Sequence, residues 1–235
     1  MFASTLEGPV LLIGSAHVVD LEAPLRSALA DRTLDAIAVE LDAERATALL
    51  APAAVRRPSS RRGQPVVLRL WASIQRRLGE QLGGELPGAE MRTAAEVARE
   101  RGIPLLLIDD PIRETLARLF RSLSVRERVS LLFGAVVGLL IPPRLVERQL
   151  DRYTEAPADY LEELRRMYPS IARVLLDDRN EHMARRLADM RVSGYGRIAA
   201  VVGDAHLPGL AAALRRRAVP VETIGLGTLR PVRAP

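Results

Sequence analysis

Short runs of branched aliphatic residues alternate with amphipathic segments along the chain. Five runs predict buried strands: Val10–Ile13, Ala36–Glu40, Leu105–Ile108, Ile198–Val202 and Val219–Ile224. Four other segments repeat apolar residues at helical spacing: Leu21–Ala30, Asp42–Leu50, Ala89–Arg101 and Leu207–Arg217. This alternation predicts an α/β fold with a central, mainly parallel sheet flanked by helices on both faces. Functional groups should then gather at the C-terminal ends of the strands.

The 235 residues are long enough for one sizeable core, so we expect a single domain spanning 1–235. Residues 112–190 have a helical pattern interrupted at prolines, which predicts a helical insertion before the last strands. Residues 52–65 are rich in Arg, Pro, Ser and Gly, a composition typical of a mobile loop.

The amino-acid composition limits which partners, reactions and metal ligands are expected. The net charge is +5, but aromatic residues make up only 3% of the chain, too few for stacking on nucleic acid, so no nucleic-acid partner is expected. The absence of cysteine excludes disulfides and thiolate nucleophiles, and any metal must use nitrogen and oxygen ligands. The start of the chain lacks a secretory-signal pattern, and the longest apolar stretch, Val129–Ile141, is shorter than the roughly 20 residues of a membrane span. We therefore expect a cytoplasmic protein without a transmembrane segment.

Two Gly-x-x-His turns follow predicted strands at opposite ends of the sequence. They are Gly14-Ser15-Ala16-His17 and Gly203-Asp204-Ala205-His206. A glycine after a strand permits a sharp turn that sets the next side chains at the rim of the sheet. Each histidine alone is readily explained by a hydrogen bond at a strand end. Because the turn occurs twice in a chain with three histidines, we expect His17 and His206 to converge on one site.

Carboxylates end two more of the predicted strands. Glu40 should project at the same rim, where it is a metal ligand, a general base, or the partner of an arginine in a salt bridge. Asp109 follows another strand and is expected either to ligate a metal or to orient a ligand histidine. Asp110, just before Pro111, is expected to cap the next helix. Imidazoles and carboxylates together predict a divalent metal site.

Further charged residues are harder to interpret from their positions. Glu90 opens an amphipathic helix, where an acidic side chain commonly interacts with the helix dipole. Arg179 could clamp a carboxylate or phosphate, and Glu181 could act as an acid or base, but such residues on a long helix usually form a solvated face. His182 has neither a partner at i+4 nor a strand-end glycine, and is left outside the site.

Two apolar segments suggest self-association. Val66–Leu82 has a stripe around Trp71, and a second apolar helix is expected near Gly134. The stripe would also suit a membrane surface or the sheet. Since little else would cover these surfaces, we expect a homo-oligomer, most simply a dimer.

Taken together, these motifs resemble the TraB/PrgY family. The matching blocks run through Leu11–Val18, Ala38–Asp42, Gly88–Met91, Ile108–Ile112, Asp178–Met183 and Val201–Gly209. The resemblance implies a wider superfamily with Tiki-like metalloproteases and erythromycin-esterase-like proteins. There, paired Gly-x-x-His motifs and a glutamate are proposed as the active centre, and Tiki-like members use manganese or cobalt. TraB/PrgY members are linked to peptide-pheromone control.

Carried onto this chain, the resemblance assigns these roles to His17, His206 and Glu40, and adds Glu90, Asp109 and Arg179 as motif positions. Asp110 departs from the arginine that the family commonly has there, and we expect no C-terminal membrane helices of the kind that many relatives carry. The leading hypothesis is a metal-dependent hydrolase of peptides, with manganese, cobalt or zinc. The alternatives are a non-catalytic module that binds a peptide or small ligand, and a metal-independent, esterase-like hydrolase.

Overall fold

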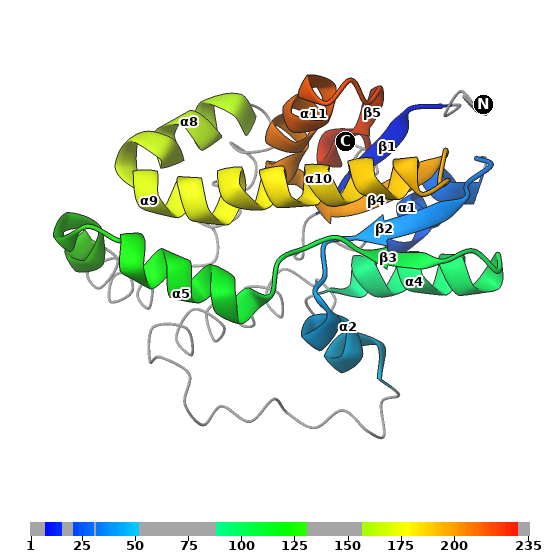
Figure 1. Cartoon of the computed structure of the whole chain (residues 1–235), viewed down its shortest axis with the longest axis horizontal. Coiled ribbons are helices and arrows are strands. Elements are labelled where there is room, and N and C mark those ends of the chain that lie inside the picture. Colours follow the sequence, from blue (N-terminus) through cyan, green and yellow to red (C-terminus); the bar gives the residue numbers. More distant parts are fainter. Residues whose placement is uncertain (1–7, 16–20, 31, 52–87, 131–156, 230–235) are drawn as a thin grey trace, which may run out of the picture.

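A single five-stranded sheet forms the centre of the molecule (Figure 1). The computed structural model describes residues 8–15, 21–30, 32–51, 88–130 and 157–229. The strands, all parallel to their neighbours, follow the order β3-β2-β4-β1-β5. They are β1 (Val10–Ser15), β2 (Ala36–Val39), β3 (Leu105–Leu107), β4 (Ile198–Gly203) and β5 (Val221–Ile224). The predicted α/β class and parallel sheet are confirmed.

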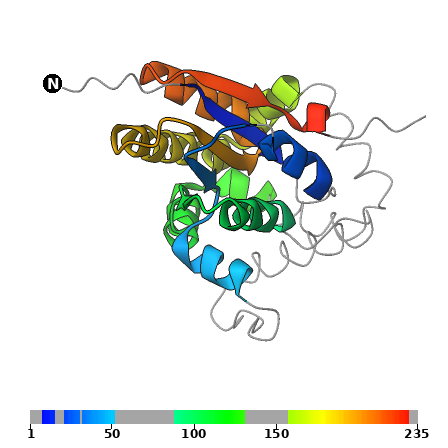
Figure 2. The same cartoon turned by 90° about the vertical axis from the view of Figure 1, so that its right-hand side faces the viewer.

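Helices cover both faces of the sheet (Figure 2). Their bounds are α1 (Glu22–Ala30), α2 (Ala43–Leu50), α4 (Ala89–Glu100), α5 (Ile112–Ser122), α8 (Pro157–Met167), α9 (Pro169–Ala172), α10 (Asp178–Val192), α11 (Leu207–Arg216) and α12 (Leu226–Leu229). A π-helical turn, Arg173–Asp177, joins α9 to α10, and a 3₁₀ turn, Asp204–His206, joins β4 to α11. The described parts of the predicted insertion, residues 112–190, are predominantly helical. In Figure 1, α5, α8 and α9 extend beyond the C-terminal edge of the sheet.

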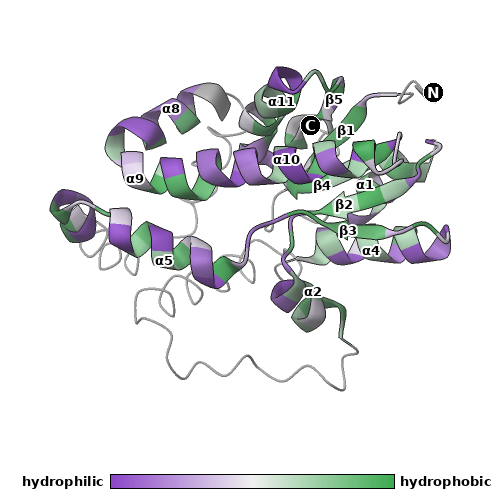
Figure 3. Ribbon diagram, viewed as in Figure 1, coloured by the Kyte–Doolittle hydropathy of each residue, from purple (hydrophilic) through white to green (hydrophobic). Residues whose placement is uncertain are grey.

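The core has two layers, one on each face of the sheet. Leu11 and Ile13 of β1 join the layer that contains residues of α1, α4 and α12. Val10 and Leu12 of the same strand join the layer formed with α10 and α11. Successive residues of a strand point to opposite faces, which is why a continuously apolar strand serves both layers. Figure 3 shows this distribution as apolar strands between helices whose outer faces are hydrophilic.

The chain reverses its direction of travel between β1 and β4, the two strands that lie side by side near the middle of the sheet. From β1 the chain crosses past β4 to β2, whereas from β4 it crosses past β1 to β5. In parallel α/β sheets, ligands bind at such a switch point, outside the carboxyl ends of the strands. The register pairs Gly14 with Val202 and Ser15 with Gly203. The two Gly-x-x-His turns therefore begin one residue apart on adjacent strands.

The carboxylate of Asp42 connects the starts of two helices, α2 and α5. Asp42 accepts hydrogen bonds from Arg45 N, at 2.8 Å, and from Ile112 N, at 3.1 Å, and so caps both α2 and α5. The prediction that Asp110 caps α5 is wrong. Pro111 occupies the N-cap position, and the Asp110 carboxylate pairs with Arg118 and His182 instead. Asp42, in the loop after β2, accepts a hydrogen bond from Ile112 N and so caps α5 in place of Asp110.

Several predicted segments lie outside the described residues. These are His17, the predicted mobile loop at 52–65, the stripe around Trp71 and the apolar segment near Gly134. Among the helices that the structure does describe, none has the length and apolar character needed to cross a membrane.

Candidate functional site

His206 and Glu40 meet at the C-terminal edge of the sheet. Glu40 directly follows β2, and its Oε2 accepts a 2.6 Å hydrogen bond from Gly203 N at the end of β4. The 3₁₀ turn after Gly203 brings His206 Nε2 to 3.4 Å from Glu40 Oε1. Only 5% of the His206 side chain and 11% of the Glu40 side chain are exposed. The prediction that both residues lie at the rim of the sheet agrees with this geometry.

Arg179, from the first turn of α10, bridges these two residues. Its Nη2 donates to Glu40 Oε1, and its Nη1 lies 3.1 Å from His206 Nε2. The π-helical turn before α10 also contributes, since Leu175 O accepts from Nη1 at 3.3 Å. Arg179 thus clamps a carboxylate, and Glu40 forms the salt bridge that the sequence left open. The described geometry is also compatible with a role for Glu40 as a ligand.

Asp109 lies behind the arginine, and its side chain is only 1% exposed. It accepts from Arg179 Nε at 3.0 Å and Nη2 at 2.7 Å, and also from Arg45 Nη2. Arg45 in turn donates to Glu40 O at 2.9 Å and to Asp42 Oδ2 at 3.1 Å. Acidic and basic side chains therefore alternate from Asp42 to Glu40, and each buried carboxylate faces at least one guanidinium.

The charges around Glu40 fix its ionisation. Burial alone would raise the pKa of Glu40, but three interactions outweigh it: attraction to His206 when the imidazole is protonated, attraction to Arg179, and the hydrogen bond from Gly203 N. Together they hold the pKa of Glu40 well below its usual range. For Arg179, burial lowers the pKa while Glu40 and Asp109 raise it, and the net pKa is above the usual value. Glu40 is thus a carboxylate at neutral pH, and a weak base.

Glu90 approaches the same edge from the opposite layer. It lies in the first turn of α4, is 5% exposed, and its Oε1 is 3.4 Å from Ser15 Oγ. Ser15 is paired in the sheet with Gly203, the residue that Glu40 contacts. The two glutamates therefore flank neighbouring residues on β1 and β4. Glu90 is buried beside Ser15, in contrast to a surface acid that only interacts with the helix dipole.

Two other charged residues of α10 turn away from Glu40. His182 Nδ1 lies 2.9 Å from Asp110 Oδ1, and Asp110 also pairs with Arg118. His182 therefore has a carboxylate partner that its sequence position did not reveal. Glu181 pairs with Arg216 and Arg217 of the α11 end, as expected for a solvated helix face.

His206 Nε2 and Glu40 Oε1 are atoms of the types that bind divalent metals. Two ligands of one tetrahedral metal lie about 3.3–3.6 Å apart, and His206 Nε2 and Glu40 Oε1 lie 3.4 Å apart. A third donor is not supplied by the part of the chain that the structure describes, where no cluster of three acidic or histidine side chains could hold a metal. The second predicted imidazole, His17, lies outside that part.

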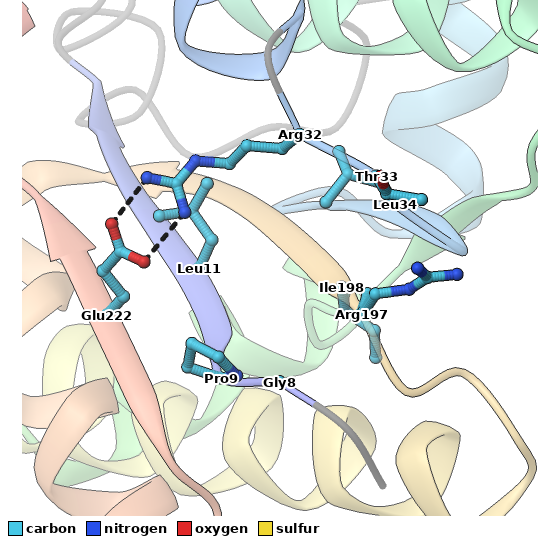
Figure 4. A pocket seen from close by; sticks show the side chains of 9 residues that line it. All are labelled: Gly8, Pro9, Leu11, Arg32, Thr33, Leu34, Arg197, Ile198 and Glu222. Carbon is cyan, nitrogen blue, oxygen red and sulfur yellow. Dashed lines mark hydrogen bonds and ion pairs between the residues drawn. The ribbon is translucent and has the colours of Figure 1, made fainter.

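A separate hollow lies at the opposite, N-terminal edge of the sheet (Figure 4). This cavity of about 260 Å³ is lined by the starts of β1 and β4 and by Arg32, which holds Glu222 through two hydrogen bonds of 2.6 and 2.8 Å. None of the predicted site residues lines it. The predicted chemistry and this hollow are therefore on different edges of the sheet.

Two residues of the site were missed in the sequence. Asn180 Oδ1 lies 2.8 Å from His206 Nδ1, and Asn180 is 3% exposed. Asparagine inside a helix is unfavourable, which is a weak signal that a tertiary contact holds it there. Arg45 gave a similar signal, because a cation in the first turn of α2 opposes the helix dipole.

These features define an α/β protein with a buried carboxylate–arginine–histidine cluster at the switch point of a parallel sheet. The model of the TraB/PrgY/gumN family matches residues 4–223, and the chain belongs to this family. The uncharacterized protein MJ1365 of Methanocaldococcus jannaschii is a curated relative that is 28% identical over 223 residues. That match covers 92% of this chain and 56% of the relative, so the chain spans about half the relative's length.

Proposed function

We propose that this site belongs to a metal-dependent hydrolase of peptides, with manganese, cobalt or zinc held by His206, Glu40 and His17. The observation that carries the proposal is the separation of 3.4 Å between two buried donor atoms, His206 Nε2 and Glu40 Oε1, at the switch point. Further support comes from the register, which brings the strand that leads to His17 beside the strand that leads to His206. Peptides are proposed as substrates on the resemblance to Tiki-like proteases.

A divalent metal bound there would supply Lewis acidity toward a carbonyl oxygen and would promote the ionisation of water. Glu40 suits the role of ligand better than that of base, because a carboxylate with a strongly lowered pKa accepts a proton poorly. Asp109 is proposed to hold Arg179 instead of ligating the metal directly, since both of its oxygens already accept from guanidinium groups. Arg179 would then place positive charge where negative charge develops in the transition state.

Proton transfer is assigned to Glu90. Its carboxylate is buried beside Ser15, on the strand next to Gly203. In this assignment Glu90 takes a proton from water, while Glu40 stays ionised throughout. The two buried glutamates would thus have different roles.

A specific contact favours a second candidate, a metal-independent hydrolase. The Arg179 guanidinium lies 3.1 Å from His206 Nε2 and also contacts Glu40, so a cation of the protein itself occupies the place where a metal would bind. In that mechanism His206 is the general base, and its Nε2 lone pair takes the proton of the attacking water. Ester substrates would then be cleaved in the presence of a chelator.

The two candidates can be separated with protein prepared without a histidine tag. Metal content is measured first, followed by cleavage of a peptide library and of simple esters, before and after chelation. We expect chelation to abolish peptide cleavage, and manganese, cobalt or zinc to restore it. His206→Gln, His17→Gln and Glu40→Gln should each lower kcat/KM by about 10²–10⁴-fold.

His182→Gln is the matched control, because it removes an imidazole that pairs with Asp110 and does not contact Glu40 among the described interactions. Its activity should remain within a few-fold of the wild type. Full peptide cleavage by metal-free protein would overturn the metal mechanism. Saturable peptide binding without any product would instead identify a binding module.

A further inference from the structure

Three polar contacts of His206 bear on where its proton lies, and one of them is the 3.4 Å separation between Nε2 and Glu40 Oε1. Nε2 is 3.1 Å from Arg179 Nη1, and Nδ1 is 2.8 Å from Asn180 Oδ1. An arginine guanidinium has only donors, so its hydrogen bond with Nε2, which is shorter than the 3.4 Å separation from Glu40 Oε1, requires Nε2 to accept with its lone pair. A neutral imidazole then carries its hydrogen on Nδ1.

Asn180 is the acceptor that this tautomer needs. An amide offers both an oxygen acceptor and an NH₂ donor, and only its Oδ1 can face an Nδ1–H. Asn180 is 3% exposed and the His206 side chain 5% exposed, so water has little access to compete for this hydrogen bond. The asparagine belongs to α10 and the histidine to the turn after β4. The contact therefore fixes the imidazole from the helix that also carries Arg179.

Gly209 leaves the space that the Asn180 amide occupies. A Cβ atom at residue 209 would lie 2.2 Å from Asn180 Nδ2 and 3.1 Å from its Cγ. The backbone of α11 can therefore approach the amide only because residue 209 has no side chain. Gly209 is the third residue of α11, and the space that it leaves for Asn180 is a physical reason for a glycine at this position.

We propose that Asn180, backed by Gly209, is the positioning residue that fixes His206 as the Nδ1–H tautomer, with the Nε2 lone pair facing Glu40 and the site. A histidine side chain free in water prefers the opposite tautomer, in which Nε2 is a donor and cannot bind a metal or take a proton. The tautomer follows from the hydrogen bonds with Arg179 and Asn180. Its consequence for metal binding rests on the function proposed above.

The tautomer is tested directly by ¹⁵N NMR of the imidazole rings in metal-free wild-type protein, at a pH where His206 is neutral. The chain has three histidines, and a spectrum of His206→Gln assigns the ring that disappears. We expect Nδ1 protonated and Nε2 unprotonated in the wild type. A protonated Nε2 would overturn the inference, whether or not the protein binds metal or has activity.

Binding of Mn²⁺ alone, measured by calorimetry, tests the consequence. Asn180→Ala and Gly209→Ala should each weaken Mn²⁺ binding by about 10–100-fold, the range found when an outer partner of a ligand histidine is removed. Asn180→Asp keeps the acceptor and should bind Mn²⁺ at least as tightly as the wild type. Circular dichroism and thermal melts check that each variant is folded.

The outcomes separate the two proposals. If the wild type binds no Mn²⁺, the metal-dependent function fails, while the NMR spectrum still decides the tautomer. If the wild type binds Mn²⁺ and folded Asn180→Ala binds equally tightly, the positioning role of Asn180 fails and the metal site stands. Equal loss in Asn180→Ala and Asn180→Asp would also contradict it, because the acceptor would then be irrelevant.

Discussion

Replacing Arg179 with methionine tests the buried charge cluster most severely. The substitution keeps an unbranched apolar side chain but removes the guanidinium that contacts Glu40, Asp109 and His206. Side-chain exposure is 12% for Arg179, 11% for Glu40 and 1% for Asp109. The variant therefore leaves a carboxylate buried without its main cationic partner.

Removing one partner of a buried ion pair typically costs about 3–5 kcal/mol. Asp109 retains Arg45, so we expect a loss near the lower end, about 3 kcal/mol, from Arg179→Met at neutral pH. The direction in which stability changes with pH follows from the lowered pKa of Glu40. Its lowered folded pKa stabilises the wild type above the usual 4.5, and this stabilisation is lost as pH falls through the folded pKa. In the variant, burial raises the pKa of Glu40, so the deficit should be largest at neutral pH and shrink in acid.

Urea denaturation at about pH 7 and about pH 4 measures both effects. Arg185→Met, an exposed position on the same helix, is the control and should change the free energy of unfolding by less than about 0.5 kcal/mol. The double variant Arg179→Met/Glu40→Gln should recover part of the loss, because it removes the orphaned charge. A loss below about 1 kcal/mol at both pH values would refute the reasoning.

Three further predictions concern the frame of the site. Gly14→Ala should cost about 1–3 kcal/mol in thermal unfolding, since its Cβ would lie 2.1 Å from Asp204 Oδ1; an unchanged melting temperature would show that Asp204 moves freely. Asp42→Ala should cost about 2 kcal/mol in urea unfolding, roughly 1 for each helix it caps, with Asp42→Asn as the milder control; equal stabilities would argue against capping. Burial alone would raise the pKa of Glu127, but hydrogen bonds from Ser124 and Ser170 lower it to about 2. Ionised Glu127 should therefore stabilise the folded state above the usual pKa of 4.5, and this stabilisation should disappear as the pH falls from 4.5 to about 2. A Glu127→Gln variant whose free energy of unfolding changes with acid pH as that of the wild type does would contradict this.

The strands and helices could be predicted because their signals are local. Apolar runs such as Val10–Ile13 and helical spacing in Leu207–Arg217 depend on neighbours a few residues away. The strand order could not be derived in that way. The placement of β4 between β2 and β1 depends on crossovers that pass through a long helical segment, and it is this order that brings Gly203 beside Ser15.

The candidate site was predictable only where it ends a strand. Glu40 and His206 follow apolar runs, so the direction of the strands placed both at one edge. Arg179 and Glu90 lie on helices, and only the family resemblance singled them out. Asn180 could not be found because its role depends on a contact with the turn after β4. Asp110 was misassigned because Asp42, distant in sequence, supplies the cap.

The central claim is that His206 and Glu40 hold a divalent metal together with His17. The most direct test is a crystal soaked in MnCl₂, with diffraction data collected to reveal anomalous scattering from manganese. We predict an anomalous peak about 2.0–2.3 Å from both His206 Nε2 and a Glu40 carboxylate oxygen, with the His17 imidazole as a further ligand. Absence of a peak, with Arg179 Nη1 still bonded to His206 Nε2, would contradict the claim and leave the metal-independent hydrolase as the better account.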